Sequence, residues 1–223
     1  MNIVLVSNCM IIVVGGIKGG AGKSTIAVNL AVARSTRHKV LLADGDDQIS
    51  TTMWAAQRDL NYPDKSPNLS HVRVSGADTR TSLQKFTAEY EDIIVDVGGR
   101  DTTTQRAALS VADLLLIPLQ PRSVDLWTLG NVSEVVGEVL TINPNLKCAA
   151  FINRAFGGGS DNQDAMDIIT ETTHIELAPL KIGDRKSFSN SFGMGLAVPE
   201  IKPVDKKAVA ELQSLYLYCY HRL

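Results

Sequence analysis

The residues best suited to chemistry form a glycine-rich stretch that begins at Lys18 and ends at Thr25. Glycines allow several backbone N–H groups to converge on one anion, and the N-terminus of a following helix adds partial positive charge. In such a stretch Lys23 supplies a fixed cation for the β- and γ-phosphates of a nucleotide, and Ser24 supplies a hydroxyl for Mg²⁺. The sequence therefore predicts a phosphate-binding loop made of Lys18, Gly19, Gly20, Ala21, Gly22, Lys23, Ser24 and Thr25.

The sequence around this stretch fits that prediction. An apolar run over 10–14 predicts a buried strand before it, and the residues of 26–33 predict a helix after it. The usual loop pattern begins with glycine where this chain has Ile17, and a second lysine, Lys18, lies inside the loop. The alternative is an ordinary turn between a strand and a helix, but strand, glycine loop and helix together favour phosphate binding.

Carboxylates follow two further predicted strands. The strand over 39–43 ends at Asp44, which opens the acidic run 44–47, and the strand over 92–96 ends at Asp96. Ligands of parallel α/β sheets bind at the carboxyl ends of strands, so the acidic run is suited to holding a metal or orienting water. Its alternative role is to cap the next helix. Asp96 suits Mg²⁺, because a buried strand makes its carboxylate rigid, and the glycines of 97–99 let backbone approach a γ-phosphate.

Strand and helix patterns alternate along the whole chain. The predicted strands cover 10–14, 39–43, 71–74, 92–96, 112–118, 147–152 and 175–180. The predicted helices cover 22–36, 49–60, 78–90, 102–110, 124–141, 161–172 and 206–220. This order predicts a single α/β domain over 1–223 with a mostly parallel, twisted sheet and helices on both faces.

Charge is distributed unevenly in a chain whose formal net charge is only −2. Such a balance excludes a global basic field for nucleic acid. Residues 181–223 nevertheless carry seven basic and four acidic residues. This excess is either a solvated surface or a weak polyanion-binding face, and its candidate contacts are Arg185, Lys186, Lys202, Lys206 and Lys207.

The remaining composition indicates a cytoplasmic protein. The three cysteines have no metal-binding spacing, which favours a reducing compartment, and no apolar run approaches the roughly 18 residues of a membrane helix. Residues 1–16 lack a basic start, and cleavage after them would remove the first strand, so we reject a signal peptide. Met10 is an alternative start, with residues 1–9 as a dispensable extension.

Taken together, the motifs resemble those of the ParA/MinD family of deviant Walker A P-loop ATPases. The glycine loop is similar to the family's first motif, and 41–48 is similar to its Asp-x-Asp-Pro-Gln motif, with Asp47 in place of proline. Segment 94–99 resembles the Walker B and switch region, 118–125 resembles the Pro-x-x-Pro-x-x-x-Asp segment, and 182–200 resembles the late loop and helix. Small ParA proteins of plasmid partition are the most similar members. The chain shows neither the N-terminal DNA-binding extension of larger members nor the C-terminal basic amphipathic helix of the MinD kind.

The resemblance implies a nucleotide-switched homodimer that encloses two molecules of ATP with Mg²⁺. It implies that Lys18 reaches phosphates bound to the opposite subunit and that Asp44 orients the attacking water. Ser24 and Asp96 would hold Mg²⁺, and Asn153 would contact the adenine edge. In this family the ATP-bound dimer binds DNA nonspecifically on the nucleoid, and a centromere-binding, ParB-like adaptor stimulates hydrolysis during segregation of a plasmid or chromosome.

Two other functions stay open from the sequence. One is a relative that positions a membrane or protein cargo without binding DNA. The other is a metabolic enzyme with the same loop, such as an ATP-dependent ligase of the dethiobiotin synthetase type. The ligase would have no need for Lys18 in trans. The apolar positions of 206–220 are expected to face the core, so we expect no membrane partner.

Overall fold

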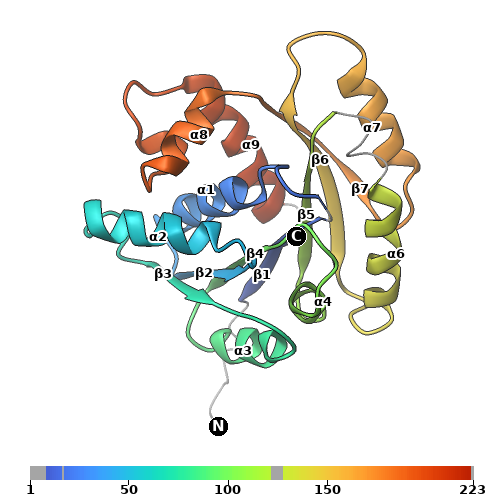
Figure 1. The fold of residues 1–223 in the computed structure, drawn as a ribbon, viewed down its shortest axis with the longest axis horizontal. Helices are drawn as coiled ribbons and strands as arrows, with labels where there is room; N and C mark the ends of the chain where they lie inside the picture. The colour runs from blue at the N-terminus through green and yellow to red at the C-terminus, as the bar shows by residue number, and fades with distance from the viewer. Residues whose placement is uncertain (1–8, 17, 122–127, 222–223) are drawn as a thin grey trace.

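Seven parallel strands form the central sheet of the computed structural model (Figure 1), which describes residues 9–16, 18–121 and 128–221. The strands are β1 (Met10–Val14), β2 (Val40–Gly45), β3 (Leu69–Arg73), β4 (Asp92–Val97), β5 (Leu114–Leu119), β6 (Lys147–Ala155) and β7 (Glu176–Gly183). Their order in the sheet is β3-β2-β4-β1-β5-β6-β7, and every neighbouring pair is parallel. The predicted α/β fold with a parallel sheet is therefore confirmed.

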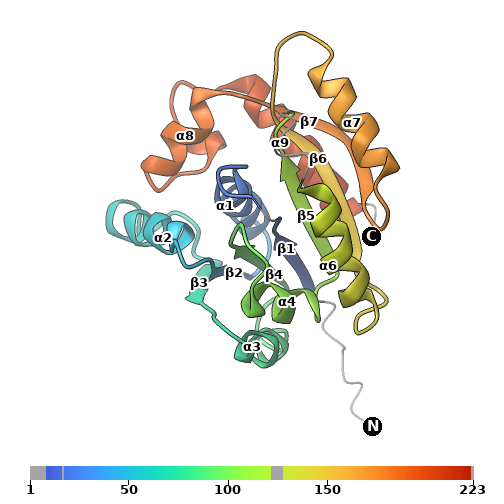
Figure 2. The same cartoon turned by 45° about the vertical axis from the view of Figure 1, so that its right-hand side comes forward.

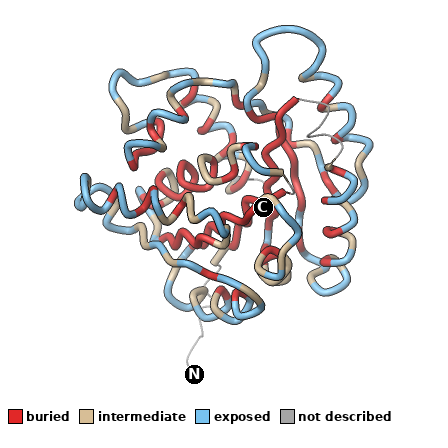
Figure 3. The backbone as a smooth tube through the Cα atoms, in the orientation of Figure 1, coloured by how far each residue is buried: buried red, intermediate tan, exposed pale blue. Residues whose placement is uncertain are grey.

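Helices cover both faces of this sheet (Figure 2). One face carries α1 (Lys23–Ser35), α2 (Ser50–Asn61), α8 (Lys186–Gly193), the 3₁₀ turn η1 (Val198–Glu200) and α9 (Lys206–His221). The other face carries α3 (Asp78–Phe86), α4 (Thr103–Leu109), α6 (Leu129–Leu140) and α7 (Asp161–Glu171). The inner strands are buried along nearly their whole length (Figure 3). Burial on both faces explains why their sequences are nearly continuous apolar runs.

The topology creates a crevice beside the carboxyl ends of β1 and β4. These two strands are neighbours, yet the chain leaves β1 through α1 on one face and leaves β4 through α4 on the other. Parallel sheets bind ligands at such switch points, because the two connections diverge and leave the strand ends open. The loop after β1 and the switch segment after β4 therefore meet at this crevice.

The structure confirms the type of each predicted element within the described residues and changes several ends. The predicted helix over 78–90 ends at Phe86, because turns follow it in which hydrogen bonds join residues three positions apart, such as Glu89 N to Phe86 O. The sixth and seventh strands run on to Ala155 and Gly183, which pair with each other. Positions 124–127 of the predicted helix over 124–141 lie outside the described residues.

The last helix, α9, packs against the core as expected. Leu212, Leu215 and Cys219 are buried in the cluster between the sheet and α1. In the described part of the chain, no helix combines the length and apolarity needed to cross a membrane.

Candidate functional site

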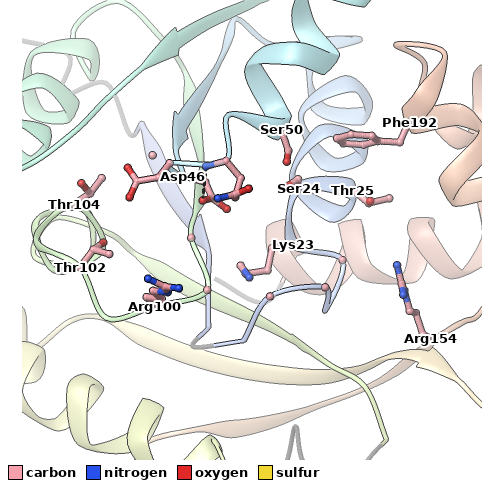
Figure 4. Close-up of a pocket in the computed structure, with 18 residues that line it drawn as sticks. Lys23, Ser24, Thr25, Asp46, Ser50, Arg100, Thr102, Thr104, Arg154 and Phe192 are labelled. Carbon is pink, nitrogen blue, oxygen red and sulfur yellow. Dashed lines mark hydrogen bonds between the residues drawn. The ribbon is translucent and has the colours of Figure 1, made fainter.

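A pocket of about 600 Å³ lies in the crevice between the glycine loop and the ends of β2 and β4 (Figure 4). The loop and the start of α1 line one side of it. The acidic run after β2 and the switch segment after β4 line another, and Arg154 and Phe192 stand at its margin. The principal lining residues are Gly19, Gly20, Gly22, Lys23, Ser24, Thr25, Asp46, Asp47, Gln48, Gly98, Gly99, Arg100, Thr102 and Thr104.

Three side chains hold the carbonyl groups of the loop. Lys23 Nζ donates to Lys18 O at 2.7 Å, Gln120 Nε2 donates to Gly20 O at 2.8 Å, and Asn153 Nδ2 donates to Ala21 O at 2.7 Å. In a trans peptide the N–H points opposite to the carbonyl. Each bonded carbonyl therefore directs the N–H group of the following residue away from the side chain that donates to that carbonyl. The three N–H groups are then available to an anion.

Two glycines of this region have no room for a side chain. Gly22 adopts φ +90°, and a Cβ there would lie 2.4 Å from Asn153 Nδ2. A Cβ on Gly99 would lie 2.6 Å from Gly19 N. The first glycine allows Asn153 to hold the loop, and the second allows the segment after β4 to touch it.

Lys23 is buried at the first turn of α1, with an exposed fraction of 6%. Burial lowers the pKa of its ammonium, and the carboxylates of Asp96 and Asp46 counteract this effect. The cation is therefore held between the loop and two carboxylates, where a phosphate would face it.

Asp96 is fully buried at the end of β4 and accepts a hydrogen bond from Thr51 Oγ1 at 2.5 Å. Burial raises the pKa of this carboxyl to about 7, while the hydroxyls of Thr51 and Ser24 act in the opposite direction. Its Oδ1 has no hydrogen-bond partner within the described ranges. A buried oxygen without a partner next to a serine hydroxyl fits Mg²⁺, so Ser24 and Asp96 are the residues that would hold it.

The described residues contain no group of three or more His, Cys, Asp or Glu side chains that could hold a metal ion without other ligands. Mg²⁺ does not require such a group, because it is commonly held by one or two protein groups together with substrate phosphates and water.

Asp44 and Asp46 have different surroundings. Asp44 is 2% exposed, and its Oδ2 accepts hydrogen bonds from Thr52 N at 2.7 Å and from Thr52 Oγ1 at 2.6 Å. It thus caps the first turn of α2, the alternative role that the sequence left open. Asp46, not Asp44, lines the pocket. A Cβ on Gly98 would lie 3.1 Å from Asp46 Oδ1, so this carboxylate is close to the backbone after β4. Asp46 is therefore the carboxylate that faces the pocket, while Asp44, which the resemblance assigned to the attacking water, is turned toward α2.

A second pocket of about 610 Å³ continues from the first, between the end of β6 and α8. Its lining includes Phe188 and Phe192, two rings suited to a flat base, together with Asn153 and Arg154. Asn153 is 5% exposed and holds the loop through its amide. Its contact with adenine stays a prediction. Arg154 adopts φ +54°, an uncommon backbone conformation for a residue with a side chain, at the junction of the two pockets.

The five candidate DNA contacts do not share one environment. Arg185 forms a two-pronged ion pair with Glu211, at 3.0 Å from Nε and 2.5 Å from Nη2. Lys186 is exposed and lines the second pocket. Lys202, Lys206 and Lys207 are exposed around the start of α9. The last three are therefore the better candidates for contacts with an external polyanion.

Sequence reasoning missed three residues that serve the site. Thr51 holds Asp96, Gln120 holds the loop, and Arg100 lines the pocket. Only Arg100 left a signal in the sequence, since it directly follows the predicted switch glycines. Ile17 and positions 122–125 of the Pro-x-x-Pro segment lie outside the described residues.

Residues 12–198 match the CobQ/CobB/MinD/ParA nucleotide binding domain. The chain belongs to this family. Its membership agrees with the geometry of the loop and explains why the switch segment, the acidic run and the base-side pocket converge on it.

Two known proteins of different description are similar to this chain. The Maintenance of carboxysome distribution protein A of Halothiobacillus neapolitanus is 23% identical over 91% of this chain and 92% of its own length. Protein ParA of Rhizobium radiobacter is 35% identical, over 52% of this chain and 50% of its own length. Among solved structures, one described as a plasmid partition protein from Borrelia burgdorferi B31 bound to AMPPNP aligns with a TM-score of 0.78. It is 20% identical and covers 96% of this chain and 100% of that chain.

Replacing each of the two aspartates by alanine should separate an effect on stability from an effect on catalysis. We expect Asp44→Ala to lower the free energy of unfolding by about 1–3 kcal/mol, because Thr52 loses a buried charged acceptor. Asp46→Ala should change stability by less than about 1 kcal/mol yet reduce ATP turnover on the order of 100-fold. Urea denaturation and a phosphate-release assay measure the two effects. A stable Asp44→Ala variant without turnover would restore Asp44 as the residue beside the water.

The buried carboxyl of Asp96 predicts a pH dependence of stability in the absence of Mg²⁺ and nucleotide. Its folded-state pKa of about 7 lies above the usual aspartate value of 3.8, so folding favours its protonated form. Its contribution is therefore largest below pH 4 and is lost as pH rises toward 7. We expect Asp96→Asn to gain stability relative to the parent over this range, on the order of 3 kcal/mol by pH 7.5.

Urea denaturation at pH 4.5, 6 and 7.5 in EDTA measures this difference. The control is Asp64→Asn at an exposed position, which measures the effect of the same chemical change away from the site. A constant difference between Asp96→Asn and the parent would show that burial of this carboxylate carries no cost.

Proposed function

We propose that this chain is an ATPase that uses Mg²⁺-ATP to switch its self-association and thereby positions a cargo, in the manner of a ParA-type partition protein. The observation that carries the proposal is the convergence of a held phosphate loop, a buried lysine and an unsatisfied buried carboxylate in one pocket. Together these groups match the triphosphate and metal of ATP.

The chain's own residues divide the work of hydrolysis. The loop N–H groups and Lys23 bind the phosphates, and Asp46 accepts a hydrogen bond from water on the side of the γ-phosphate. Bound Mg²⁺ would supply a further cation that neutralises charge on the phosphates. Thr51 holds Asp96 and Thr52 is held by Asp44, so the start of α2 is fixed to both strand ends. This fixation gives the reacting groups a defined geometry.

Lys18 is the residue that links nucleotide binding to association in this proposal. It is the first residue of the loop, and its backbone packs against Gly99 of the switch segment. A cation that reaches the phosphates of a second copy would make the dimer depend on ATP. A metabolic ligase would not need a lysine that reaches the phosphates of a second copy.

Two cargoes have support of different kinds. Exposed Lys202, Lys206 and Lys207 support nonspecific DNA, bound through phosphates by a dimer that doubles the patch. Similarity to a carboxysome distribution protein over nearly the whole chain supports a second function, positioning of a protein cargo. A centromere-binding, ParB-like adaptor is the proposed stimulator for the first function, and the cytoplasm with its nucleoid is the proposed location.

Co-sedimentation of the full chain with a nonspecific DNA duplex tests the DNA function. We expect DNA binding with ATP but not with ADP, and a steep decrease in affinity with added salt. The double change Lys206→Ala and Lys207→Ala should weaken binding, whereas the matched double change at exposed Lys85 and Lys147 should not. ATP turnover without any ATP-dependent DNA binding would contradict partition and favour the protein-cargo function.

Lys18→Ala should separate nucleotide binding from association. The pinned carbonyls and Lys23 remain, so the variant should bind ATP within a few-fold of the parent but stay monomeric in light scattering. Its turnover should fall on the order of 100-fold because the γ-phosphate loses a cation. Lys23→Ala, in contrast, should lose nucleotide binding in calorimetry. An ATP-dependent dimer of Lys18→Ala with normal turnover would refute the role in trans and favour the ligase alternative.

A further inference from the structure

We propose that Arg100 is a second catalytic cation of this site, which contacts the γ-phosphoryl group from within the same subunit as it transfers to water. The inference rests on the proposed ATPase function and adds a residue to it. It concerns the segment that joins β4 to α4, directly after the switch glycines.

The backbone on the N-terminal side of Arg100 is pressed against the phosphate loop. A Cβ on Gly99 would lie 2.6 Å from both Gly19 N and Lys18 C, and a Cβ on Gly98 would lie 3.1 Å from Asp46 Oδ1. The backbone directly before Arg100 therefore contacts the loop and lies beside Asp46, the carboxylate that we assign to the attacking water.

The backbone on the C-terminal side is fixed as well. Asp101 is paired with Arg106 through two contacts of 2.7 Å, and Thr102 Oγ1 caps α4 by accepting a hydrogen bond from Gln105 N at 3.1 Å. The first of these contacts also matters for charge. Because Asp101 is engaged by Arg106, it does not neutralise the neighbouring guanidinium of Arg100.

The guanidinium of Arg100 has no hydrogen bond or ion pair with any residue that the structure describes, and the residue is exposed at the pocket. Figure 4 shows Arg100 on the side of the pocket that also holds Asp46, Thr102 and Thr104. Arg154 lies on the opposite side of the loop, toward the second pocket. We therefore assign Arg100 to the γ-phosphate end of the proposed nucleotide, on the side of Asp46, and Arg154 to the other end.

The negative charge of the pocket favours a cation at position 100. Asp46 and Asp47 line the pocket, and Asp96 lies buried at the end of β4. These carboxylates and the polyanionic nucleotide repel one another, while Lys23 is the one cation buried beneath the loop in the described chain. A guanidinium at position 100 offsets this repulsion on the side where Asp47 adds negative charge.

The reaction defines where this cation acts. A bond forms between the water oxygen and Pγ, and the bond from Pγ to the β,γ-bridging oxygen breaks. The bridging oxygen leaves with its electron pair on ADP, and the water proton passes through Asp46 to the phosphate product. The forked N–H groups of Arg100 donate to non-bridging γ-oxygens, which lie farther from Lys23 as transfer proceeds. Its contribution is therefore larger in the transition state than in bound ATP.

Binding of the full chain to Mg²⁺-ADP, with and without aluminium fluoride as a mimic of the transferring phosphoryl group, tests this assignment. We expect Arg100→Ala to bind ADP within about twofold of the parent, but to bind ADP with aluminium fluoride about 100-fold more weakly. Turnover should fall by a similar factor. Arg100→Lys should recover part of both, because it restores the charge but not the fork. Arg80→Ala, at an exposed position on α3 outside the pocket, is the matched control and should resemble the parent.

Four outcomes would overturn the inference. Equal loss of affinity for ADP with and without aluminium fluoride would show a general structural or ground-state effect. Unchanged affinity for the mimic would show that Arg100 does not contact the transferring group. Loss of ATP-dependent association in Arg100→Ala, measured by light scattering, would place its partner across the dimer and refute action within one subunit. Failure of the parent itself to bind ADP would instead refute the proposed ATPase function, and this inference with it.

Discussion

The structure depends on how the phosphate loop is held from three directions. Lys23 from α1, Gln120 from the end of β5 and Asn153 from β6 each donate to a different loop carbonyl. A glycine-rich segment loses much conformational entropy on folding, so it keeps one geometry only if its polar groups are fixed. Once the carbonyls are engaged, the N–H groups that face an anion are positioned before the anion arrives. The distant strands β5 and β6 are thus part of the phosphate site without contributing to its lining on the γ-phosphate side.

A second set of contacts joins the switch side of the pocket to the same frame. Asp44 and Asp96 are register neighbours at the ends of β2 and β4, and each is bound by a threonine from the first turn of α2. Two adjacent buried carboxylates repel each other, and separate hydroxyl donors make the arrangement tolerable. As a consequence, any movement of the β4 end is passed directly to the start of α2. The start of α2 is therefore joined to both strand ends at the pocket.

The far end of α2 is tied to the base side of the nucleotide site. Arg58, 4% exposed, pairs with Glu200 at 2.8 and 2.9 Å and donates to Gly195 O at 3.0 Å. Gly195 follows α8, whose phenylalanines line the second pocket. The two pockets share Gly22, Thr25, Arg154 and Phe192 in their linings. Arg58 therefore joins α2, whose first turn lies at the first pocket, to the segment that follows α8 at the second.

The local sequence by itself determined the strands, the helices and the phosphate loop, because these depend on apolar periodicity and on glycine between a strand and a helix. It also predicted Asp96, since an aspartate that ends a buried strand can lie only at the open edge of a parallel sheet. The resemblance assigned the attacking water to Asp44, whereas in the folded chain Asp46 lines the pocket. The two side chains have equal chemistry and lie two positions apart, and only the packing of α2 onto β2 pairs Asp44 with Thr52 and leaves Asp46 at the pocket. The roles of Gln120 and Asn153 in holding the loop likewise depend on contacts across as many as 132 positions of sequence. Such contacts are products of the strand order, and the strand order is a property of the folded chain.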